Sequence, residues 1–230
     1  MGARIELFFR YLTEYGYYKI ILTGLKNTLI IAVCGLLIGI VLGTLVAAVK
    51  IASARNRVAK VFSYIGDVYT SVFRGTPIVV QLMIFHFIIF KGTDLSDLLR
   101  VVLVFGLNSG AYVAEIMRGG ILSVDIGQTE AGRTLGLSYT TTMLRIVFPQ
   151  AVKNVIPTLG NELIALTKDT SVAGYVATMD LNAAFSAIAG ATYDVMIPYI
   201  MLAVVYFVIV IIMAALVRLV ERRMRKSEKR

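Results

Sequence analysis

Long uncharged apolar segments alternate with short basic or polar segments along almost the whole chain. The first apolar run extends from about Thr28 to Val49 and contains no charged residue. About 20 apolar residues let a helix cross a hydrocarbon core of roughly 30 Å, so this run predicts a membrane-spanning helix. The pattern predicts five such spans, at about residues 28–49, 58–90, 98–117, from Pro157 through Asp169, and 199–217.

Three glycines, Gly35, Gly39 and Gly43, recur every four residues in the first span. A stripe of small residues lets the backbone of another helix approach closely, which predicts helix packing at this face. A hinge or a seam between two subunits is the alternative interpretation.

The second apolar region, residues 58–90, would be about 50 Å long as a single helix, which exceeds the thickness of the bilayer core. The sequence Arg74-Gly75-Thr76-Pro77 predicts a break in this region. Thr76 is expected to cap a new helix, and Pro77 is expected to occupy its first turn. The break would direct backbone N–H groups and Arg74 into a cavity within the protein.

Basic residues orient the predicted spans. They cluster after the first span and at the end of the chain, at Lys50, Arg55, Arg57, Lys60, Arg218, Arg222, Arg223, Arg225, Lys226, Lys229 and Arg230. Short loops rich in Lys and Arg stay in the cytoplasm, so the N-terminus is expected outside and the C-terminus in the cytoplasm. Residues 91–97 are then an external turn, and residues 174–194, which contain no Lys or Arg, are an external loop.

Composition supports a membrane chain, because 58% of the 230 residues are hydrophobic, more than an ordinary soluble domain buries. The predicted fold is therefore all-α and polytopic, with residues 1–230 forming a single transmembrane domain. No removable signal peptide is apparent, and the lone Cys34 supports neither a disulfide nor a thiolate metal site. Topology and contact with anionic lipid account for much of the net charge of +9, so a nucleic-acid partner is not expected.

A polar segment with small residues separates the third and fourth predicted spans. It reads Glu130-Ala131-Gly132, three residues, Gly136, nine residues, and then Ile146-Val147-Phe148-Pro149. Gly136 permits the backbone angles of a tight turn, and Pro149 is expected to stop a helix. The pattern predicts two short helices joined at Gly136, which together form a docking loop.

This spacing resembles the signature loop in permease subunits of ABC importers, which reads Glu-Ala-Ala, three residues, Gly, nine residues and Ile-x-Leu-Pro. Gly132 and Phe148 replace an alanine and a leucine of that pattern, and the glycine weakens the first short helix slightly. Motifs that resemble the polar amino-acid uptake branch surround the loop: Arg74-Gly75-Thr76-Pro77 with Gln81, Ala111-Tyr112-Val113-Ala114-Glu115 with Arg118-Gly119-Gly120, Gly160-Asn161-Glu162, and Lys168-Asp169-Thr170-Ser171.

The resemblance implies that residues 1–230 are a single permease domain with a core similar to that of type I ABC importers, in the plasma (inner) membrane of a bacterium. Residues at about 120–150 are then its cytoplasmic ATPase-docking loop. It implies three kinds of partner: a second permease (this chain or a close relative), two cytoplasmic ATPase subunits and an extracytoplasmic amino-acid-binding protein. The chain contains no phosphate-binding loop pattern, so ATP and Mg are expected on the partner ATPase, and no cofactor or metal is expected on this chain. The expected ATPase-docking residues are Glu130, Ala131, Gly132, Leu135, Gly136 and Leu137.

Two acids in the fourth span are candidate substrate contacts, because charges within a membrane are costly and usually functional. Glu162 and Asp169 are seven residues apart, which places both on one helix face about 10 Å apart. Such a pair suits a cationic group, although structural ion pairs are the alternative. Arg74, Gly75 and Thr76 offer a complementary site for a substrate carboxylate. The alternatives there are an arginine that extends to the interface, or a turn that only shapes the break.

Glu115 and Arg118 stand three residues apart and predict a local ion pair that fixes the end of a helix. Asp67 either faces a cytoplasmic vestibule or caps a neighbouring helix. His86 is the only histidine, and a lone histidine in an apolar run predicts packing and no metal site.

The substrate class and the energy source leave alternatives. The two acids favour a basic amino acid, but an uncharged polar amino acid also presents an ammonium group that one carboxylate can hold. An ATP-independent secondary carrier would also need buried charges and broken helices. An intramembrane hydrolase is disfavoured because no nucleophile with a nearby base is apparent. The expected mechanism is alternating access, in which ATP-driven movement of the docking loop switches the paired permeases.

Overall fold

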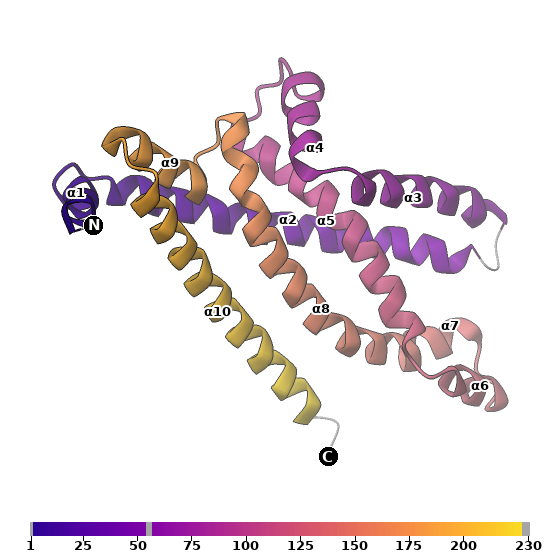
Figure 1. Cartoon of the computed structure of the whole chain (residues 1–230). Helices are drawn as coiled ribbons and strands as arrows, with labels where there is room; N and C mark the ends of the chain where they lie inside the picture. The colour runs from indigo at the N-terminus through magenta and orange to yellow at the C-terminus, as the bar shows by residue number, and fades with distance from the viewer. Residues whose placement is uncertain (1, 54–56, 227–230) are drawn as a thin grey trace. The chain divides into compact units, whose positions relative to one another are not determined.

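The computed structural model describes residues 2–53 and 57–226, without the side chains of residues 225 and 226. This part of the chain is helical and contains no strand (Figure 1). In chain order the elements are α1 (Gly2–Thr13), α2 (Tyr18–Ala52), α3 (Arg57–Gly75), α4 (Ile78–Ile84), the π-helix η1 (Phe85–Ile89), α5 (Asp97–Leu122), α6 (Ile126–Thr134), α7 (Tyr139–Thr142), the π-helix η2 (Met143–Val147), α8 (Phe148–Asp169), the 3-10 helix η3 (Thr170–Val176), α9 (Leu181–Thr192) and α10 (Met196–Lys226). Arg55, Lys229 and Arg230 lie outside the described residues, as do the side chains of Arg225 and Lys226.

The described helices include enough long apolar segments for a polytopic membrane protein. Three of them, α2, α5 and α10, are long and apolar enough to cross a bilayer. Two bent helix pairs raise the number of candidate spans to five: α3 with the segment Ile78–Ile89, and the segment Tyr139–Val176 with α9. The predicted all-α polytopic fold is therefore confirmed.

The break predicted in the second apolar region lies where the sequence placed it, but its capping was predicted wrongly. Helix α3 ends at Gly75, and α4 begins at Ile78. Pro77 occupies the N-cap position with extended backbone, and no side chain caps the helix there. The Oγ1 atom of Thr76 instead accepts a hydrogen bond from Nε2 of Gln81 at 2.9 Å. Proline suits this position because it has no N–H group to leave unpaired.

The described chain forms two compact units. Unit 1 comprises Met1–Leu37, Thr76–Gly106 and Leu163–Met213, and unit 2 comprises Ile38–Gly75, Leu107–Glu162 and Ala214–Arg230. The long helices α2, α5, α8 and α10 each contribute one part to unit 1 and one part to unit 2.

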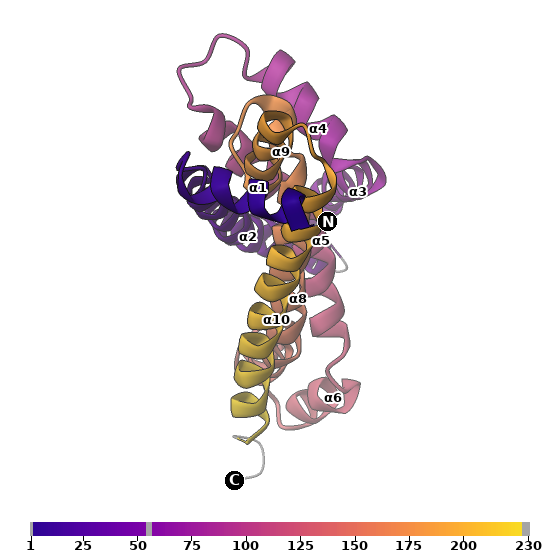
Figure 2. The ribbon, with the colours of Figure 1, turned by 60° about the vertical axis from the view of Figure 1, so that its left-hand side comes forward.

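Unit 1 has an apolar core in which α1 packs against α9 (Figure 2). Phe8 of α1 is only 2% exposed, and its ring stacks 6.4 Å from the ring of Phe185. Other buried members of this core are Leu181, Ile188, Ile197 and Leu202. The first 20 residues, which carry no recognisable motif, therefore include a helix that buries an aromatic side chain.

The external loop predicted at residues 174–194 is wrong, because α9 occupies most of that segment. Its buried residues recur with helical spacing, at Leu181, Ala184, Phe185, Ile188 and Ala189. Asp180 caps the helix by accepting a hydrogen bond from the N–H of Ala183 at 2.6 Å. The absence of Lys and Arg from residues 174–194 was used to place the segment outside the membrane, but it says nothing about secondary structure. The apolar residues of the segment recur with the period of a helix.

The glycine stripe of α2 packs against α5, as predicted. In unit 2, a Cβ atom added to Gly39 would lie 2.6 Å from Oγ of Ser109, and one added to Gly43 would lie 2.7 Å from the backbone nitrogen of Ala114. In unit 1, a Cβ atom on Gly35 would meet Cβ of Phe105 at 3.2 Å. The absence of side chains on this face lets the two helices approach closely.

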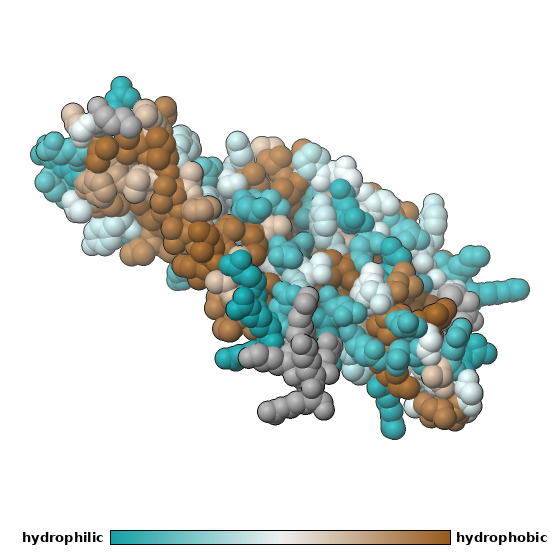
Figure 3. Space-filling model, turned by 60° about the horizontal axis from the view of Figure 1, so that its bottom comes forward, coloured by the Kyte–Doolittle hydropathy of each residue, from teal (hydrophilic) through white to brown (hydrophobic). Residues whose placement is uncertain are grey.

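Large apolar side chains remain exposed on several helices. Figure 3 shows broad brown areas of such side chains on one face. On α10 they include Phe207, Val208, Ile211, Ile212 and Leu216. Exposed apolar surface of this kind is typical of a face that meets hydrocarbon or another protein.

Candidate functional site

The segment from Asp125 to Val147, called the α6–α7 element below, contains the predicted docking loop. It consists of two short helices and the π-helix η2, all within unit 2 (Figure 1). The backbone between the helices turns at Gly136, whose φ is +76°. The N–H of Leu137 donates to the carbonyl of Gly132 at 3.0 Å, which closes the turn. The predicted turn at Gly136 between two helices is confirmed, but the second helix is not short, because α7, η2 and α8 follow one another without a break from Tyr139 to Asp169.

Polar side chains cap both short helices. Asp125 accepts a hydrogen bond from the N–H of Gly127 at 2.7 Å, and Ser138 accepts one from the N–H of Thr141 at 3.2 Å. These caps satisfy donors that a helix N-terminus otherwise leaves without an intrahelical partner. A helix as short as α6 is marginal on its own, so capping and packing hold it in place.

Gly132 is the buried contact between α6 and α7. A Cβ atom at this position would lie 2.6 Å from Cγ2 and 2.7 Å from Oγ1 of Thr142. Thr142 is itself fully buried, and its Oγ1 donates to the carbonyl of Ser138 at 3.1 Å. The replacement of alanine by Gly132 therefore makes room for the threonine side chain.

The α6–α7 element exposes several large apolar side chains among charged and polar ones. Of the predicted docking residues, Glu130, Ala131, Leu135, Gly136 and Leu137 are exposed and Gly132 is buried. The exposed fraction of Leu135 is 78%. Three further exposed residues, Leu122, Ile126 and Leu144, lie in or beside the element. These three residues are not part of the Glu130–Pro149 motif, so the motif did not identify them. The sequence showed only that they are apolar residues in or beside a polar segment.

Pro149 does not stop a helix, so that expectation is wrong. It is the second residue of α8, which follows η2 without a break. Proline removes one intrahelical hydrogen bond and crowds the preceding turn, and the wider π-helical turn η2 stands directly before it.

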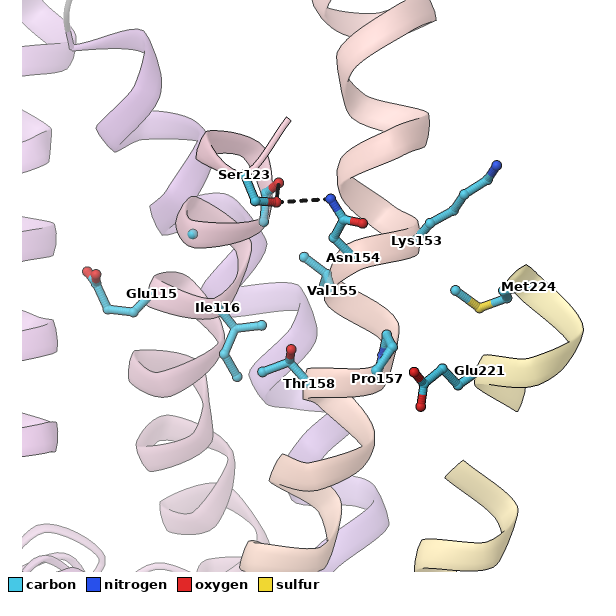
Figure 4. Close-up of a pocket in the computed structure, with 12 residues that line it drawn as sticks. Glu115, Ile116, Ser123, Lys153, Asn154, Val155, Pro157, Thr158, Glu221 and Met224 are labelled. Carbon is cyan, nitrogen blue, oxygen red and sulfur yellow. Dashed lines mark hydrogen bonds between the residues drawn. The ribbon is translucent and has the colours of Figure 1, made fainter. Parts of the chain in front are cut away.

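Side chains join α5 and α8 beside the α6–α7 element in unit 2, and one of them reaches the element. Nδ2 of Asn154 on α8 donates to Oγ of Ser123, just after the end of α5, at 2.9 Å (Figure 4). Gly120 leaves the space on α5 that Val155 of α8 fills. Nε2 of Gln150 on α8 donates to Oε1 of Gln128 on α6 at 3.2 Å. The element is therefore attached to α8, and α8 is attached to α5.

A cavity of about 900 Å³ lies in unit 2 beside these attachments (Figure 4). Residues of α5, the start of α8 and the end of α10 line it, among them Glu115, Gly119, Lys153, Thr158, Glu221 and Met224. The lining carries carboxylate, ammonium and hydroxyl groups, so it can solvate a polar molecule of either charge.

Four charged residues of unit 2 form one ion-pair chain, called the Lys50 cluster below. Nζ of Lys50 lies 2.9 Å from Oε1 of Glu115 and 3.0 Å from Oδ1 of Asp67. Oε2 of Glu115 accepts from Arg118, with Nη2 at 2.8 Å and Nε at 3.0 Å. The predicted Glu115–Arg118 pair is confirmed, and Asp67 is a partner of Lys50 and not a helix cap. Lys50 was visible in the sequence only as a marker of topology, because its partners are distant along the chain.

The predicted substrate residues occupy different local environments. Glu162 is partly buried in α8 and accepts a hydrogen bond from Oγ of Ser109 at 3.3 Å. Asp169 is the last residue of the same helix and is exposed. Arg74, at the end of α3, places its guanidinium carbon 5.4 Å from the ring centre of Tyr112. Gly75 ends α3 and Thr76 precedes α4.

Three comparisons relate the chain to known proteins. Residues 35–226 match the family model described as "Binding-protein-dependent transport system inner membrane component". The chain is 39% identical to "Arginine transport system permease protein ArtQ" of Bacillus subtilis (strain 168), in a match that covers 90% of this chain and 94% of that protein. It is 34% identical to "Glutamine transport system permease protein GlnP" of Escherichia coli (strain K12), covering 90% and 93%.

A solved structure has a similar fold. The structure is described as "Crystal structure of an amino acid ABC transporter with histidines". It matches with a TM-score of 0.83 and 35% identity, over 93% of this chain and 98% of that chain.

Proposed function

Because the chain belongs to the family of binding-protein-dependent transport system inner membrane components, we propose that it is the permease subunit of an ATP-driven amino-acid importer. The chain supplies the membrane path as a single permease domain, and a partner ATPase hydrolyses ATP with Mg. Two ATPase subunits, a second permease and an extracytoplasmic amino-acid-binding protein complete the transporter. It lies in the plasma (inner) membrane of a bacterium, with the N-terminus outside and the C-terminus in the cytoplasm.

The exposed apolar surface of the α6–α7 element is the observation that carries this proposal. Leu135 and Ile126 expose 78% and 74% of their surface, next to the exposed carboxylate side chain of Glu130. Exposed large apolar side chains with polar groups beside them are typical of a protein–protein contact. Its sequence spacing, with Gly136 at the turn, is that of the loop through which ABC permeases are expected to meet their ATPase.

The proposed substrate is a basic amino acid. Its ammonium and cationic groups would meet Glu162 and Asp169, and its carboxylate would meet Arg74 and the backbone around Gly75 and Thr76. The two acids lie seven residues apart on α8, Glu162 in unit 2 and Asp169 in unit 1. The name of the arginine permease supports this assignment. The name of the glutamine permease favours the alternative, an uncharged polar amino acid.

The test of this function is ATP hydrolysis and uptake in proteoliposomes that contain the permease, its ATPase and its binding protein. Single amino acids are scanned for stimulation, and the scan is repeated with Glu162→Gln, Asp169→Asn and the control Asp94→Asn. Loss of one charge-assisted contact of about 1.5–3 kcal/mol raises the half-maximal concentration roughly 10- to 150-fold. Stimulation by glutamine alone would favour the uncharged substrate, and uptake without ATPase would indicate a secondary carrier.

The docking role is tested separately by the affinity of the ATPase for the permease in detergent or nanodiscs. Glu130→Arg and Leu135→Asp alter exposed residues, so insertion and folding are expected to be unchanged. Both variants are expected to bind the ATPase at least ~10-fold more weakly, which corresponds to about 1.4 kcal/mol. Glu6→Arg, an equal charge reversal at an exposed residue of α1, is the matched control. ATPase binding at the unmodified affinity in both docking variants would refute the assignment.

Transport is proposed to proceed by alternating access. ATP closes the pair of ATPase subunits, and this closure displaces the α6–α7 elements of the two permeases. The hydrogen bond between Gln150 and Gln128 carries the displacement into α8, and the hydrogen bond between Asn154 and Ser123 couples α8 to the end of α5. The free energy of ATP binding differs between the inward-facing and outward-facing states, and this difference shifts the populations of the two states.

A further inference from the structure

The ammonium group of Lys50 is buried within unit 2, where its side chain is 8% exposed. Its three acceptors are Oε1 of Glu115 at 2.9 Å, Oδ1 of Asp67 at 3.0 Å and Oγ1 of Thr70 at 3.0 Å. A lysine ammonium has three N–H donors, so each donor has one partner. The acceptors come from α3 and α5, and Lys50 itself is on α2. One side chain therefore joins three helices.

The charges of the Lys50 cluster balance, and its two ends are its most exposed members. Two cations and two carboxylates alternate along the chain Asp67, Lys50, Glu115, Arg118. The terminal side chains of Asp67 and Arg118 are 60% and 44% exposed, and that of Glu115 is 22% exposed. Because every donor and carboxylate oxygen at the centre has a defined partner, the cluster fixes the helices in one register.

The cluster also lies on the helix that leads to the α6–α7 element. From Glu115, α5 continues to its end at Leu122, and Asp125 then caps α6. The seven residues from Glu115 to Leu122 span about 10 Å, or two turns. A displacement of the element along the chain therefore reaches Glu115 through a short stretch of continuous helix.

We propose that Lys50 is a positioning residue that couples ATP hydrolysis to transport. It fixes α2 and α3 to α5 near the α6–α7 element, so that a displacement of that element moves the three helices together. Without Lys50, the end of α5 moves alone and ATP is hydrolysed with little transport. This role rests on the proposed function of the chain as an ABC permease.

Removal of the ammonium group leaves the remaining cluster groups with partners or with solvent. Glu115 keeps both hydrogen bonds from Arg118, and its side chain also borders the cavity. Thr70 keeps its hydrogen bond to the carbonyl of Gly66 at 3.0 Å, and Asp67 is mostly exposed. Lys50→Met retains a long apolar side chain in place of the lysine stem. It is therefore a variant in which the unit is expected to remain folded.

The experiment measures the amount of amino acid taken up per ATP hydrolysed in proteoliposomes that contain the complete transporter. We expect Lys50→Met to lower this ratio at least ~10-fold while the ATPase still binds with unchanged affinity. Thr70→Val removes one of the three acceptors without a change of charge, and it is expected to lower the ratio about 2- to 5-fold. Lys50→Arg keeps the charge and is expected to retain more coupling than Lys50→Met. Lys60→Met, at an exposed lysine of α3, is the matched control and is expected to leave the ratio unchanged.

Two results would overturn the role of Lys50. The first is an unchanged ratio in Lys50→Met. The second is a parallel loss of uptake, ATP hydrolysis, ATPase affinity and thermal stability in both Lys50→Met and Thr70→Val, which a purely structural role would produce. If the unmodified complex takes up no amino acid on addition of ATP, the proposed function itself fails, and the role of Lys50 fails with it.

Discussion

Substitution of Gly132 by alanine restores the residue type of the ABC permease signature, and it is expected to impair docking. The added methyl group would lie 2.6 Å from Cγ2 and 2.7 Å from Oγ1 of Thr142. Rotation about χ1 of the threonine does not relieve both contacts, because its two heavy substituents occupy two of the three staggered positions. Gly132→Ala therefore pushes α6 away from α7.

The magnitude follows from two opposed effects. Overpacking a tight contact costs roughly 1–3 kcal/mol, and alanine is favoured over glycine within a helix by about 0.5–1 kcal/mol. In Gly132→Ala, the native packing of α6 on α7 is then less favourable by a net free energy of about 0.5–2 kcal/mol. If the ATPase binds the native packing of α6 on α7, its dissociation constant rises roughly 2- to 30-fold.

The assay is a double-mutant cycle on the affinity between the ATPase and the permease in nanodiscs. Thr142→Ala removes both clashing atoms and leaves Cβ, which is 3.2 Å from the added methyl position. Alone it loses one hydrogen bond, about 0.5–1.5 kcal/mol, although the carbonyl of Ser138 still accepts from the N–H of Thr142 at 2.9 Å. The double variant is expected to bind more tightly than Gly132→Ala. Gly119→Ala, where a Cβ meets nothing within 4 Å, is the control.

Two outcomes would refute this explanation of Gly132. Unchanged affinity in Gly132→Ala would show that the contact has no effect on docking. Additive losses in the double variant would show that Thr142 is not the source of the clash, because coupled residues should deviate from additivity.

The remaining predictions concern backbone conformation and helix packing. Gly136→Ala places a side chain at φ +76° and should weaken ATPase binding by about 1–2 kcal/mol, measured as above; an unchanged affinity would contradict it. Gly43→Ala directs a methyl group to within 2.7 Å of the backbone of α5, and should lower the detergent melting temperature, whereas Gly119→Ala should not. The buried N–H of Leu181 donates to Oγ1 of Thr28 at 3.1 Å. Thr28→Val removes this acceptor and should lower the free energy of unfolding by about 1–3 kcal/mol. Equal melting temperatures of Thr28→Val and the unmodified chain would contradict this prediction.

Local patterns predicted local structure well. The spacing around Gly136 predicted a turn between two short helices, because a positive φ at a single position is a property of the backbone there. The pair of Glu115 and Arg118 followed from helical spacing alone. The glycines of α2 predicted a close helix contact, but not that its partner was α5, since periodicity says which face packs and not what it packs against.

Features that depend on distant contacts were missed. Lys50 lies 65 residues before Glu115 along the chain, so no local pattern connects them. The helix α9 was taken for a loop because its segment was judged by charge, although Leu181, Ala184 and Ile188 carry a helical period. The core position of Phe8 depends on contacts between α1 and α9, and the sequence analysis predicted neither helix.

Gly132 illustrates why a departure from a family pattern cannot be weighed by propensity alone. Taken singly, glycine for alanine weakens α6, and the sequence predicted only that loss. The structure adds a gain, because Thr142 fills the space where the alanine methyl would lie and donates a hydrogen bond to the carbonyl of Ser138. Gly132 and Thr142 therefore fit each other as a pair. Alanine at position 132 would need a smaller residue at position 142. The stabilising effect belongs to the pair, so exchange of either residue alone is expected to be worse than exchange of both.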